Sequence, residues 1–386
     1  MTRRLRTVAG RRILGAMAMQ GVASAAATER FRQRFASCDP CHFRRFQDVW
    51  ASSIGLGTYL GDSDDATDAQ YAQAIETALA RGCNVIDTAI NYRCQRSERT
   101  IGRTLQRLAH DQTITRDELL LCTKGGYLPF DQGVPTDPAR YLARTVIEPG
   151  LAQPDEIVAG CHCLAPSYLA HALRTSLANL RVSSVDVYYL HNPEQQLDEV
   201  PLTVLHERLR QAFELLERCA TDGILRNYGI ATWQGLRANP RATEYVALEP
   251  LVRLAESIAG PAHHFRAIQL PYNLAMPEAA AFTNQSVDGE PLTPLAAAER
   301  LGLSVAISAS LLQQRLARLP AGLDRYLPGP CTDAQRALNL VRSTPGVCTA
   351  LVGMKQRAHV EENLALAQQP PYTAQQVTQL FDRSLR

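Results

Sequence analysis

The sequence has no excess of charge of either sign and no long apolar run. Its 386 residues include 40 basic and 38 acidic side chains, which gives a formal net charge of +2. Such a balance leaves no electrostatic footprint for nucleic acid or for an anionic membrane surface. No stretch approaches the roughly 18 apolar residues that a membrane-spanning helix needs. With 46% hydrophobic and 20% charged residues, the composition is that of an ordinary globular protein, and we expect neither nucleic acid nor a membrane as a partner.

The chain also lacks the dense cysteine framework of a small secreted domain. Its ten cysteines are scattered along the whole length, which favours reduced thiols in a reducing compartment. The segment MTRRLRTVAGRRILGAMAMQGVASAAA at the N-terminus has the basic start and small residues of a secretory signal or an Arg-rich transit peptide. Gly15, Gln20 and Gly21 interrupt its apolar run, so we predict a cytoplasmic protein.

The segment CDPCH, from Cys38 to His42, fits the C-x-x-C-H pattern of c-type haem attachment. The alternative is a loop that holds two thiols and a histidine ahead of the folded domain. No second ligand pair at zinc-site spacing accompanies it, and we predict no metal site. A periplasmic redox protein that uses Cys38 and Cys41 stays open as an alternative. Residues 1–42, rich in Arg and Ala, are expected to form a loosely packed extension before a domain that spans 43–386.

Short apolar runs alternate with helix-length segments after residue 50. Eight such runs, each followed by a helical segment, predict an α/β fold of the (β/α)8 TIM-barrel type rather than an open doubly wound sheet. The central runs are almost continuously apolar, as strands buried on both faces are. The expected strands span 54–58, 84–87, 119–123, 185–190, 225–231, 267–270, 304–308 and 347–352, and helical patterns cover 68–81, 97–108, 200–220, 243–258, 331–342 and 356–367.

Two connections are longer than an ordinary link between a strand and a helix. Residues 125–165 and 273–293 are rich in Gly, Pro and Asp. Both would follow a strand and therefore lie on the C-terminal rim of the barrel, where active sites form. We expect these extended rim loops to serve as lids or substrate walls.

Four ionisable side chains stand at or just after the ends of consecutive expected strands. Asp87 ends the second strand and Tyr92 follows it, Lys124 ends the third in LLLCTKGG, and His191 ends the fourth in VDVYYLHNP. Each has an ordinary structural explanation: a helix cap, a rim aromatic, a snorkelling cation or a core histidine. Because strand ends of a barrel meet at one mouth, their coincidence predicts a functional site.

The chemistry available to these groups is definite. A tyrosine has a reference pKa near 10, and a nearby lysine cation is expected to lower it. Asp87 would hold Lys124 charged and in place, and His191 could orient a carbonyl oxygen by a hydrogen bond. The set predicts protonation of an oxygen by Tyr92 while a hydride reaches the attached carbon.

Six segments of the sequence resemble the aldo-keto reductase family, in the right order and over residues 50 to 370: GLGTYLG, NVIDTAINYRCQRSERTIG, CTKGG, VDVYYLHNP, QLPYNL and STPGVCTALVGMKQRAHVEENL. The resemblance implies a (β/α)8 barrel, and hydride transfer between NADPH (or NADH) and an aldehyde or ketone. It places Asp87, Tyr92, Lys124 and His191 in the catalytic tetrad, with Tyr92 as the general acid. The implied partner is a small-molecule carbonyl compound or alcohol.

The resemblance also implies cofactor contacts. Gln269 corresponds to the glutamine that meets the nicotinamide carboxamide, and Glu362 and Asn363 to the pair at the adenine. Lys355 or Arg357 could hold a 2′-phosphate, although both could equally stand at a solvated helix start. The turn around the adenosine phosphate would contain Gly353, Met354 and Lys355.

Three positions depart from the family pattern. Thr232 stands where the family has asparagine, Ser308 where an aromatic residue usually stacks on the nicotinamide, and His359 where arginine is usual. Trp233 or Tyr272 could replace the missing aromatic ring. Because the departures at Thr232 and Ser308 affect the nicotinamide contacts and that at His359 the adenine site, an NADPH-binding sensor with little turnover is the alternative function.

Overall fold

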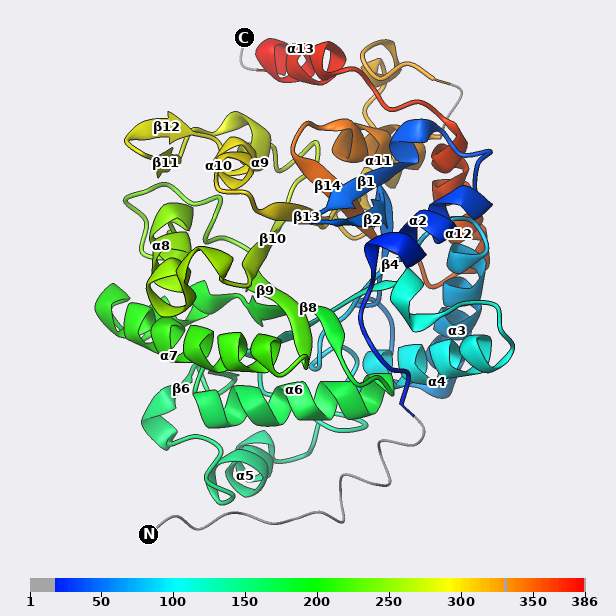
Figure 1. Ribbon diagram of the computed structural model, residues 1–386. Helices are drawn as coiled ribbons and strands as arrows, with labels where there is room; N and C mark the ends of the chain where they lie inside the picture. The colour runs from blue at the N-terminus through cyan, green and yellow to red at the C-terminus, as the bar shows by residue number, and fades with distance from the viewer. Residues whose placement is uncertain (1–17, 330–331, 385–386) are drawn as a thin grey trace.

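The computed structural model, which describes residues 18–329 and 332–384, is built around a closed barrel of eight parallel strands (Figure 1). The barrel order is β10-β13-β14-β3-β4-β5-β8-β9. This confirms the predicted (β/α)8 class, and every predicted strand lies within two residues of an observed one. The strands are β3 (Ile54–Gly57), β4 (Val85–Asp87), β5 (Leu120–Gly125), β8 (Val185–His191), β9 (Leu225–Ala231), β10 (Phe265–Pro271), β13 (Ser304–Ser308) and β14 (Val347–Gly353).

The strands are apolar because both of their faces are buried. Along β5, Leu120 and Cys122 belong to the core inside the barrel, whereas Leu121 belongs to the core between the strands and the surrounding helices. Successive side chains along a strand therefore point alternately into the barrel and toward the helices, and both environments are apolar. Neither face of the strand meets solvent. This explains why the sequence shows continuous apolar runs.

A helix follows each barrel strand and covers its outer face. The first of them begins where Oδ1 of Asp64 accepts a hydrogen bond of 2.8 Å from the backbone N–H of Thr67, a typical N-cap. The helices are α3 (Asp65–Leu79), α4 (Arg96–His110), α6 (Pro166–Leu180), α7 (Leu202–Thr221), α8 (Leu248–Ala259), α10 (Pro294–Arg300), α11 (Asp333–Ser343) and α12 (Arg357–Leu364).

The helix expected from residue 243 begins later, at Leu248. The intervening residues form turns, because the N–H of Tyr245 bonds to the carbonyl of Ala242 and the N–H of Val246 bonds to that of Gly235. A final helix, α13 (Ala374–Ser384), packs Val377 against Leu327 and Leu340.

The two long connections fold into small structures of their own. The first carries α5 (Pro138–Leu142) and the antiparallel pair β6 (Ile157–Val158) and β7 (His162–Cys163), and the second carries α9 (Glu278–Ala281), β11 (Gln285–Val287) and β12 (Glu290–Leu292). Both follow a barrel strand, and they lie on different sides of the molecule (Figure 1).

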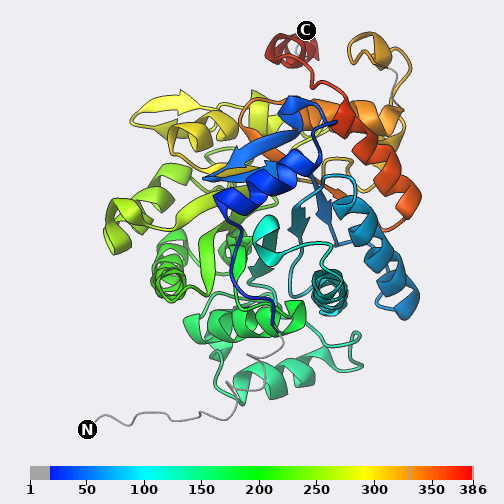
Figure 2. The ribbon, with the colours of Figure 1, turned by 45° about the vertical axis from the view of Figure 1, so that its right-hand side comes forward.

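The described part of the N-terminal extension, residues 18–42, is not loosely packed as expected. It contains α2 (Ala25–Arg34), whose Ala27 and Phe31 are buried, and it lies beside the hairpin of β1 (Phe43–Phe46) and β2 (Val49–Ser52) (Figure 2). The hairpin closes the N-terminal end of the barrel, since Phe46 and Val49 join the core inside it. The expected loose packing was wrong because the few apolar residues of this segment, scattered among Arg and Ala, show no helical periodicity in the sequence. The boundary at residue 42 stays a prediction, and residues 1–17 lie outside the described range.

His42 of the CDPCH segment is fully buried and both its ring nitrogens are bonded within the protein. Nδ1 lies 3.2 Å from Oγ of Ser53 and Nε2 lies 3.1 Å from the carbonyl oxygen of Gly82. The ring is therefore part of the packing and not an available ligand. Within residues 18–329 and 332–384, no group of three or more potential metal ligands comes together. Among the same residues, every helix is too short or too polar to traverse a lipid bilayer.

Candidate active site

The predicted tetrad residues come together at the C-terminal mouth of the barrel. Asp87, Lys124 and His191 lie on β4, β5 and β8, which are neighbours in the barrel. Nζ of Lys124 lies 2.5 Å from Oδ1 of Asp87 and 2.8 Å from the carbonyl oxygen of Thr88. The Lys124 side chain has no exposed surface and that of Asp87 is 6% exposed. The two residues form a buried ion pair.

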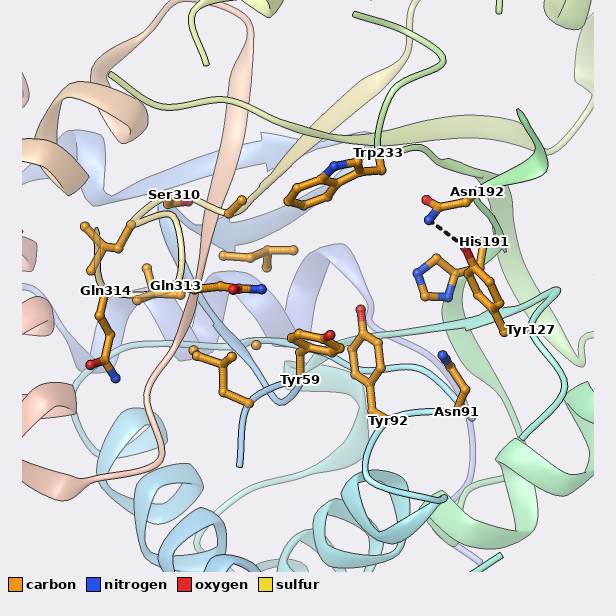
Figure 3. A pocket seen from close by; sticks show the side chains of 17 residues that line it. Tyr59, Asn91, Tyr92, Tyr127, His191, Asn192, Trp233, Ser310, Gln313 and Gln314 are labelled. Carbon is orange, nitrogen blue, oxygen red and sulfur yellow. Dashed lines mark hydrogen bonds between the residues drawn. The ribbon is translucent and has the colours of Figure 1, made fainter. Parts of the chain in front are cut away.

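Tyr92 stands beside this pair in the loop after β4. Nζ of Lys124 is 5.1 Å from the centroid of its ring. The rings of Tyr92 and His191 are 5.9 Å apart and meet edge to face at 75°. Tyr92 and His191 line the same cavity, and the hydroxyl group of Tyr92 points into it (Figure 3).

The cavity has a volume of about 430 Å³. Aromatic side chains from three different rim loops form much of its wall: Tyr59 after β3, Tyr127 after β5 and Trp233 after β9. Asn192 donates a hydrogen bond of 3.1 Å from Nδ2 to the hydroxyl of Tyr127. The combination of aromatic walls and a few polar groups is typical of small-molecule sites.

Burial and charge set the protonation states of the three central groups. Burial alone would lower the pKa of Lys124, but the charge of Asp87, the phenol of Tyr92 and the hydrogen bond to Asp87 together raise it. Burial raises the pKa of Tyr92, and Lys124 opposes this only in part. Burial, together with the cation of Lys124 and the imidazole of His162, holds the pKa of His191 well below its ordinary value. At neutral pH the site therefore contains a lysine cation, a protonated phenol and a neutral imidazole.

Lys124 does act to lower the pKa of Tyr92, as expected, but burial raises this pKa by more, so the pKa lies above its ordinary value. The sequence shows that a lysine follows a strand near a tyrosine, but it does not show how far the walls of the barrel mouth desolvate the phenol. Desolvation of a phenolate outweighs the attraction of one cation here.

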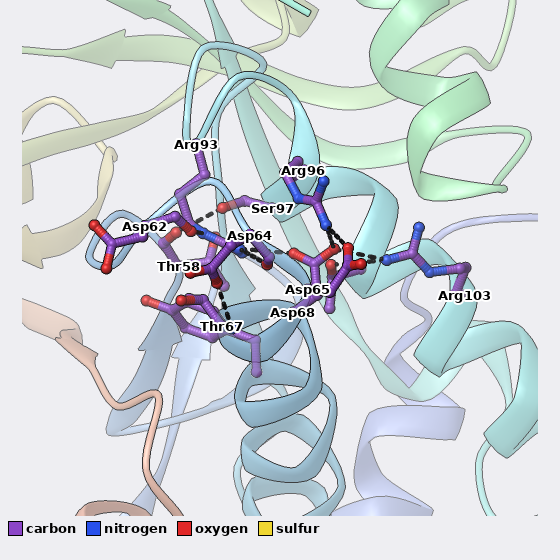
Figure 4. Close-up of polar contacts among 12 residues, drawn as sticks. Thr58, Asp62, Asp64, Asp65, Thr67, Asp68, Arg93, Arg96, Ser97 and Arg103 are labelled. Carbon is purple, nitrogen blue, oxygen red and sulfur yellow. Dashed lines mark hydrogen bonds and ion pairs between the residues drawn. The ribbon is translucent and has the colours of Figure 1, made fainter. Parts of the chain in front are cut away.

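The turn that directly follows Tyr92 is strained. Arg93, Cys94 and Gln95 have φ values of 50°, 51° and 70°, a left-handed conformation that costs a non-glycine residue roughly 1–2 kcal/mol. Arg93 secures the turn: its Nε donates to the carbonyl of Asp62 at 2.8 Å and its Nη2 donates to Oδ1 of Asp68 at 2.7 Å (Figure 4). Nothing in the sequence signals this turn, because Arg, Cys and Gln have no preference for it.

Asp68, in the first turn of α3, is bonded to the loop after β4 and to helix α4. Besides Arg93, it accepts hydrogen bonds from Arg96 at 2.8 Å and from Arg103 at 3.2 Å (Figure 4). Oγ of Ser97 in α4 also donates to the carbonyl of Thr58 at 2.8 Å. The loops that carry Tyr59 and Tyr92 are therefore fixed to each other by charged and polar contacts.

The profile of the Aldo/keto reductase family matches residues 53–250, which is just over half of the chain. The chain belongs to the aldo/keto reductase family. Its similarity to the uncharacterized oxidoreductase YqkF of Bacillus subtilis is 23% identity over 188 residues, and this alignment covers 48% of the chain but only 46% of that relative.

Solved structures similar to this aldo/keto reductase share its fold at low sequence identity. An aldo/keto reductase from Klebsiella pneumoniae in complex with NADP and acetate is 21% identical, with a TM-score of 0.59 and coverage of 89% of this chain and 95% of that one. The glycerol dehydrogenase of Gluconobacter oxydans is 17% identical, with a TM-score of 0.60 and coverage of 90% and 96%. At this identity the similarity supports the barrel fold itself.

Two residues expected at the nicotinamide carboxamide do not line the cavity of this aldo/keto reductase. Gln269 is buried and its Nε2 donates to Oδ2 of Asp87 at 2.8 Å. Thr232 is also buried, and its N–H bonds to the carbonyl of Gln269 at 2.9 Å. In this structure the amide of Gln269 therefore completes the hydrogen bonding of the carboxylate that holds Lys124.

Of the two aromatic residues expected to replace the missing ring, Trp233 lines the cavity and Tyr272 does not. Tyr272 is fully buried and its hydroxyl is 3.0 Å from Oγ1 of Thr344, so it faces away from the cavity. Trp233 is 40% exposed and lines the cavity. Ser308 ends β13 without lining the cavity, whereas Ser310, two residues further, lines it and is buried. Sequence reasoning missed Ser310, because two nearby serines cannot be told apart without the turn between them.

The residues expected at the adenosine end occupy different environments. Gly353 lines the cavity, whereas the side chain of Met354 is fully buried in the apolar core and is not available to a ligand. Lys355 has no ion-pair partner within the described ranges, and a Cβ at Gly61 would stand 3.4 Å from its Nζ. Arg357 is exposed and its Nε bonds to Glu361 at 3.0 Å.

The last two expected residues lie on α12. Oε1 of Glu362 accepts a hydrogen bond of 2.5 Å from Oγ1 of Thr332, at the start of α11. Asn363 is buried and its Oδ1 has no hydrogen-bond partner among residues 18–329 and 332–384. Glu362 is thus occupied within the protein, whereas the side-chain oxygen of Asn363 is an unused acceptor among the described residues.

Proposed function

We propose that this aldo/keto reductase transfers a hydride between NADPH and the carbonyl carbon of an aldehyde or ketone, in either direction. The observation that carries the proposal is the buried Lys124–Asp87 ion pair beside Tyr92, whose hydroxyl shares one cavity with His191. A buried cation next to a phenol stabilises the phenolate that remains after the proton has left. The family membership and the NADP-bound relative support the same reaction class.

Tyr92 is the proton donor in this proposal. NADPH held in this site would supply the hydride for the carbonyl carbon, and negative charge would then grow on the oxygen. An alkoxide is about as strong a base as hydroxide, whose conjugate acid, water, has a pKa far above that of a phenol. Even a phenol with a raised pKa therefore gives up its proton to it, and burial ensures that Tyr92 still carries that proton at neutral pH.

Lys124 and Asp87 act on the phenolate. Lys124 stays charged because its pKa is raised by Asp87, and its ammonium lies close enough to the Tyr92 ring to stabilise the charge left there. His191 is neutral and so carries one N–H donor. That donor positions the carbonyl oxygen opposite the Tyr92 hydroxyl.

Several groups of the chain fit a dinucleotide. Oγ of Ser310 and Oδ1 of Asn363 are buried and have no hydrogen-bond partner in the described chain. Because buried polar atoms normally have a partner, we assign these two to the bound dinucleotide. The free ammonium of Lys355 suits a 2′-phosphate, which favours NADPH over NADH. Trp233 offers an aromatic face to the nicotinamide in place of the residue replaced by Ser308.

The test is carbonyl-dependent oxidation of NADPH by the wild type and by Tyr92→Phe. General acid catalysis contributes about 10²–10⁴-fold, and we expect Tyr92→Phe to lose activity on that scale. The dissociation constant of NADPH, followed by quenching of tryptophan fluorescence, should change little. Binding of NADPH without oxidation by any of a panel of aldehydes and ketones would favour the sensor alternative.

A further inference from the structure

A second histidine is bonded to the strand end that carries His191. His162 belongs to β7, in the long connection after β5, and it is fully buried. Its Nε2 lies 2.7 Å from the carbonyl oxygen of His191, and its Nδ1 lies 2.7 Å from Nε2 of Gln196. Nη1 of Arg208 on α7 in turn donates to Oε1 of Gln196. A side chain from the rim insertion thus holds the backbone of the site.

The donors and acceptors in this chain of contacts fix one arrangement. The guanidinium of Arg208 can only donate, so it makes the Oε1 side of Gln196 the acceptor and turns the amide NH₂ group toward His162. Nδ1 of His162 must then accept, and the proton of the neutral ring stays on Nε2, which donates to the His191 carbonyl. The neutral form persists because burial lowers the pKa of His162 to about 4.

The ring of His191 has little else to hold it. Its Nδ1 is buried and has no hydrogen-bond partner among the residues that the structure describes. Its position therefore depends on the strand end and on packing against Tyr127. The Tyr127 ring lies 5.0 Å from the ring of His191 and 5.0 Å from that of His162, edge to face in both cases.

The chain leaves room for this contact at Gly126. A Cβ at that position would stand 2.8 Å from Nε2 of His162 and 2.9 Å from the carbonyl oxygen of His191. Gly126 also has a φ of +143°, a backbone conformation that residues with a Cβ rarely adopt. Close approach of the two histidines is therefore built into the backbone.

We propose that His162 is a positioning residue: held by Gln196 and Arg208, it fixes the end of β8 and the edge of Tyr127, and so keeps the His191 imidazole opposite Tyr92. The long connection after β5 thus serves the reaction through a buried contact behind the cavity wall. This inference rests on the proposed carbonyl reductase function, since the position of His191 affects turnover only if the site performs that chemistry.

Two substitutions and one matched control test it. His162→Leu removes the donor but fills similar space, and His162→Gln keeps an N–H that can reach the His191 carbonyl. His42→Leu is the control, because His42 is also fully buried, is bonded to the carbonyl of Gly82, and has a pKa lowered to about 4 at the opposite end of the barrel. Unfolding in urea should show similar losses of stability for the two leucine variants.

The two leucine variants should differ in kcat. Misplacement of a reacting group by about 1 Å can cost on the order of 100-fold in rate, and we expect His162→Leu to lose about 10- to 100-fold in kcat. His162→Gln should recover most of this loss, and the dissociation constant of NADPH should stay the same in all variants. His42→Leu should keep the kcat of the wild type. Equal kcat in His162→Leu and His42→Leu would overturn the proposal.

A second readout does not depend on turnover. In protein labelled with ¹⁵N-histidine, His191→Asn identifies the imidazole signals of His191 among the nine histidines. These signals should shift in His162→Leu and remain in place in His42→Leu. If the wild type oxidises no NADPH, the proposed function has failed, and the spectra alone decide whether His162 positions His191. Unshifted His191 signals in His162→Leu would overturn it.

Discussion

Nζ of Lys124 and Oδ1 of Asp87 lie 2.5 Å apart inside the mouth of the barrel, with almost no exposed surface on either side chain. Burial of two charges has a desolvation cost, and apolar residues at the two positions often give a fold that is equally stable or more stable. Because the ammonium of Lys124 lies against the Tyr92 ring, the pair has a role in the proposed proton transfer.

Removal of one partner of this pair should destabilise the protein. Lys124→Met leaves the Asp87 carboxylate buried without its cation, and breaking a buried pair in this way costs about 3–5 kcal/mol. Urea unfolding measures the change. The double variant Asp87→Leu with Lys124→Met removes both charges and should regain most of the stability, yet it should remain inactive. Wild-type turnover by the double variant would show that the pair takes no part in the reaction.

Arg93 should matter to activity as well as to folding. Arg93→Ala releases the left-handed turn after Tyr92 from its bonds to Asp62 and Asp68. We expect a loss of about 1–3 kcal/mol in unfolding free energy and a fall in kcat, because Tyr92 is no longer held. Arg103→Ala is the control, since Arg103 is half-exposed and binds the same Asp68 from the outer side. Equal kcat in the two variants would contradict a positioning effect of the turn.

The cofactor preference should depend on Lys355. A charge-assisted contact is worth roughly 1.5–3 kcal/mol, so Lys355→Ala should raise the dissociation constant of NADPH about 10- to 100-fold and leave that of NADH unchanged. Arg357→Ala is the matched control, because Arg357 already pairs with Glu361. The measurement is a fluorescence titration with each cofactor. The opposite pattern would move the phosphate contact to Arg357.

Acid should weaken the fold through its buried histidines. Burial lowers the pKa of both His42 and His162 from an ordinary 6.5 to about 4. Between pH 6.5 and 4 the unfolded chain takes up protons that the folded chain does not, so unfolding free energy falls as pH falls through this window and levels off below it. At about 1.4 kcal/mol per pH unit, each histidine accounts for on the order of 3 kcal/mol.

This pH effect can be assigned to one residue. His162→Gln has no group to titrate at that position, so its unfolding free energy should change less between pH 6.5 and pH 4 than that of the wild type. Urea unfolding at a series of pH values measures both. An identical slope in the two proteins would mean that His162 is not held neutral in the folded state.

The sequence predicts the barrel and the meeting of the four candidate site residues because both depend on regular features. Strands buried on two faces give continuous apolar runs, and residues at their ends, such as Lys124 and His191, must meet at one mouth. The alternation of strands and helices fixed the order of the elements without any knowledge of loop conformation.

Other parts of the site follow from loop geometry, which has no period to detect. The left-handed turn at Arg93 is made of residues that do not favour it, and Ser310 reaches the cavity only because the chain turns after β13. His162 lies in the long connection 125–165, where no periodic pattern marks single residues, and its contact with His191 joins residues from separate strands. The cytoplasmic location rests on the cysteine pattern and stays a prediction.

The most direct test of the central claim follows the hydride itself. NADPH carrying deuterium at C4 of its dihydronicotinamide ring is mixed with the enzyme and an aldehyde in a single turnover, and the alcohol is analysed by mass spectrometry. We expect one deuterium on the former carbonyl carbon with the wild type, and a transfer slower by about 100-fold or more with Tyr92→Phe. Transfer at the same rate in both proteins, or alcohol formed without deuterium, would contradict it.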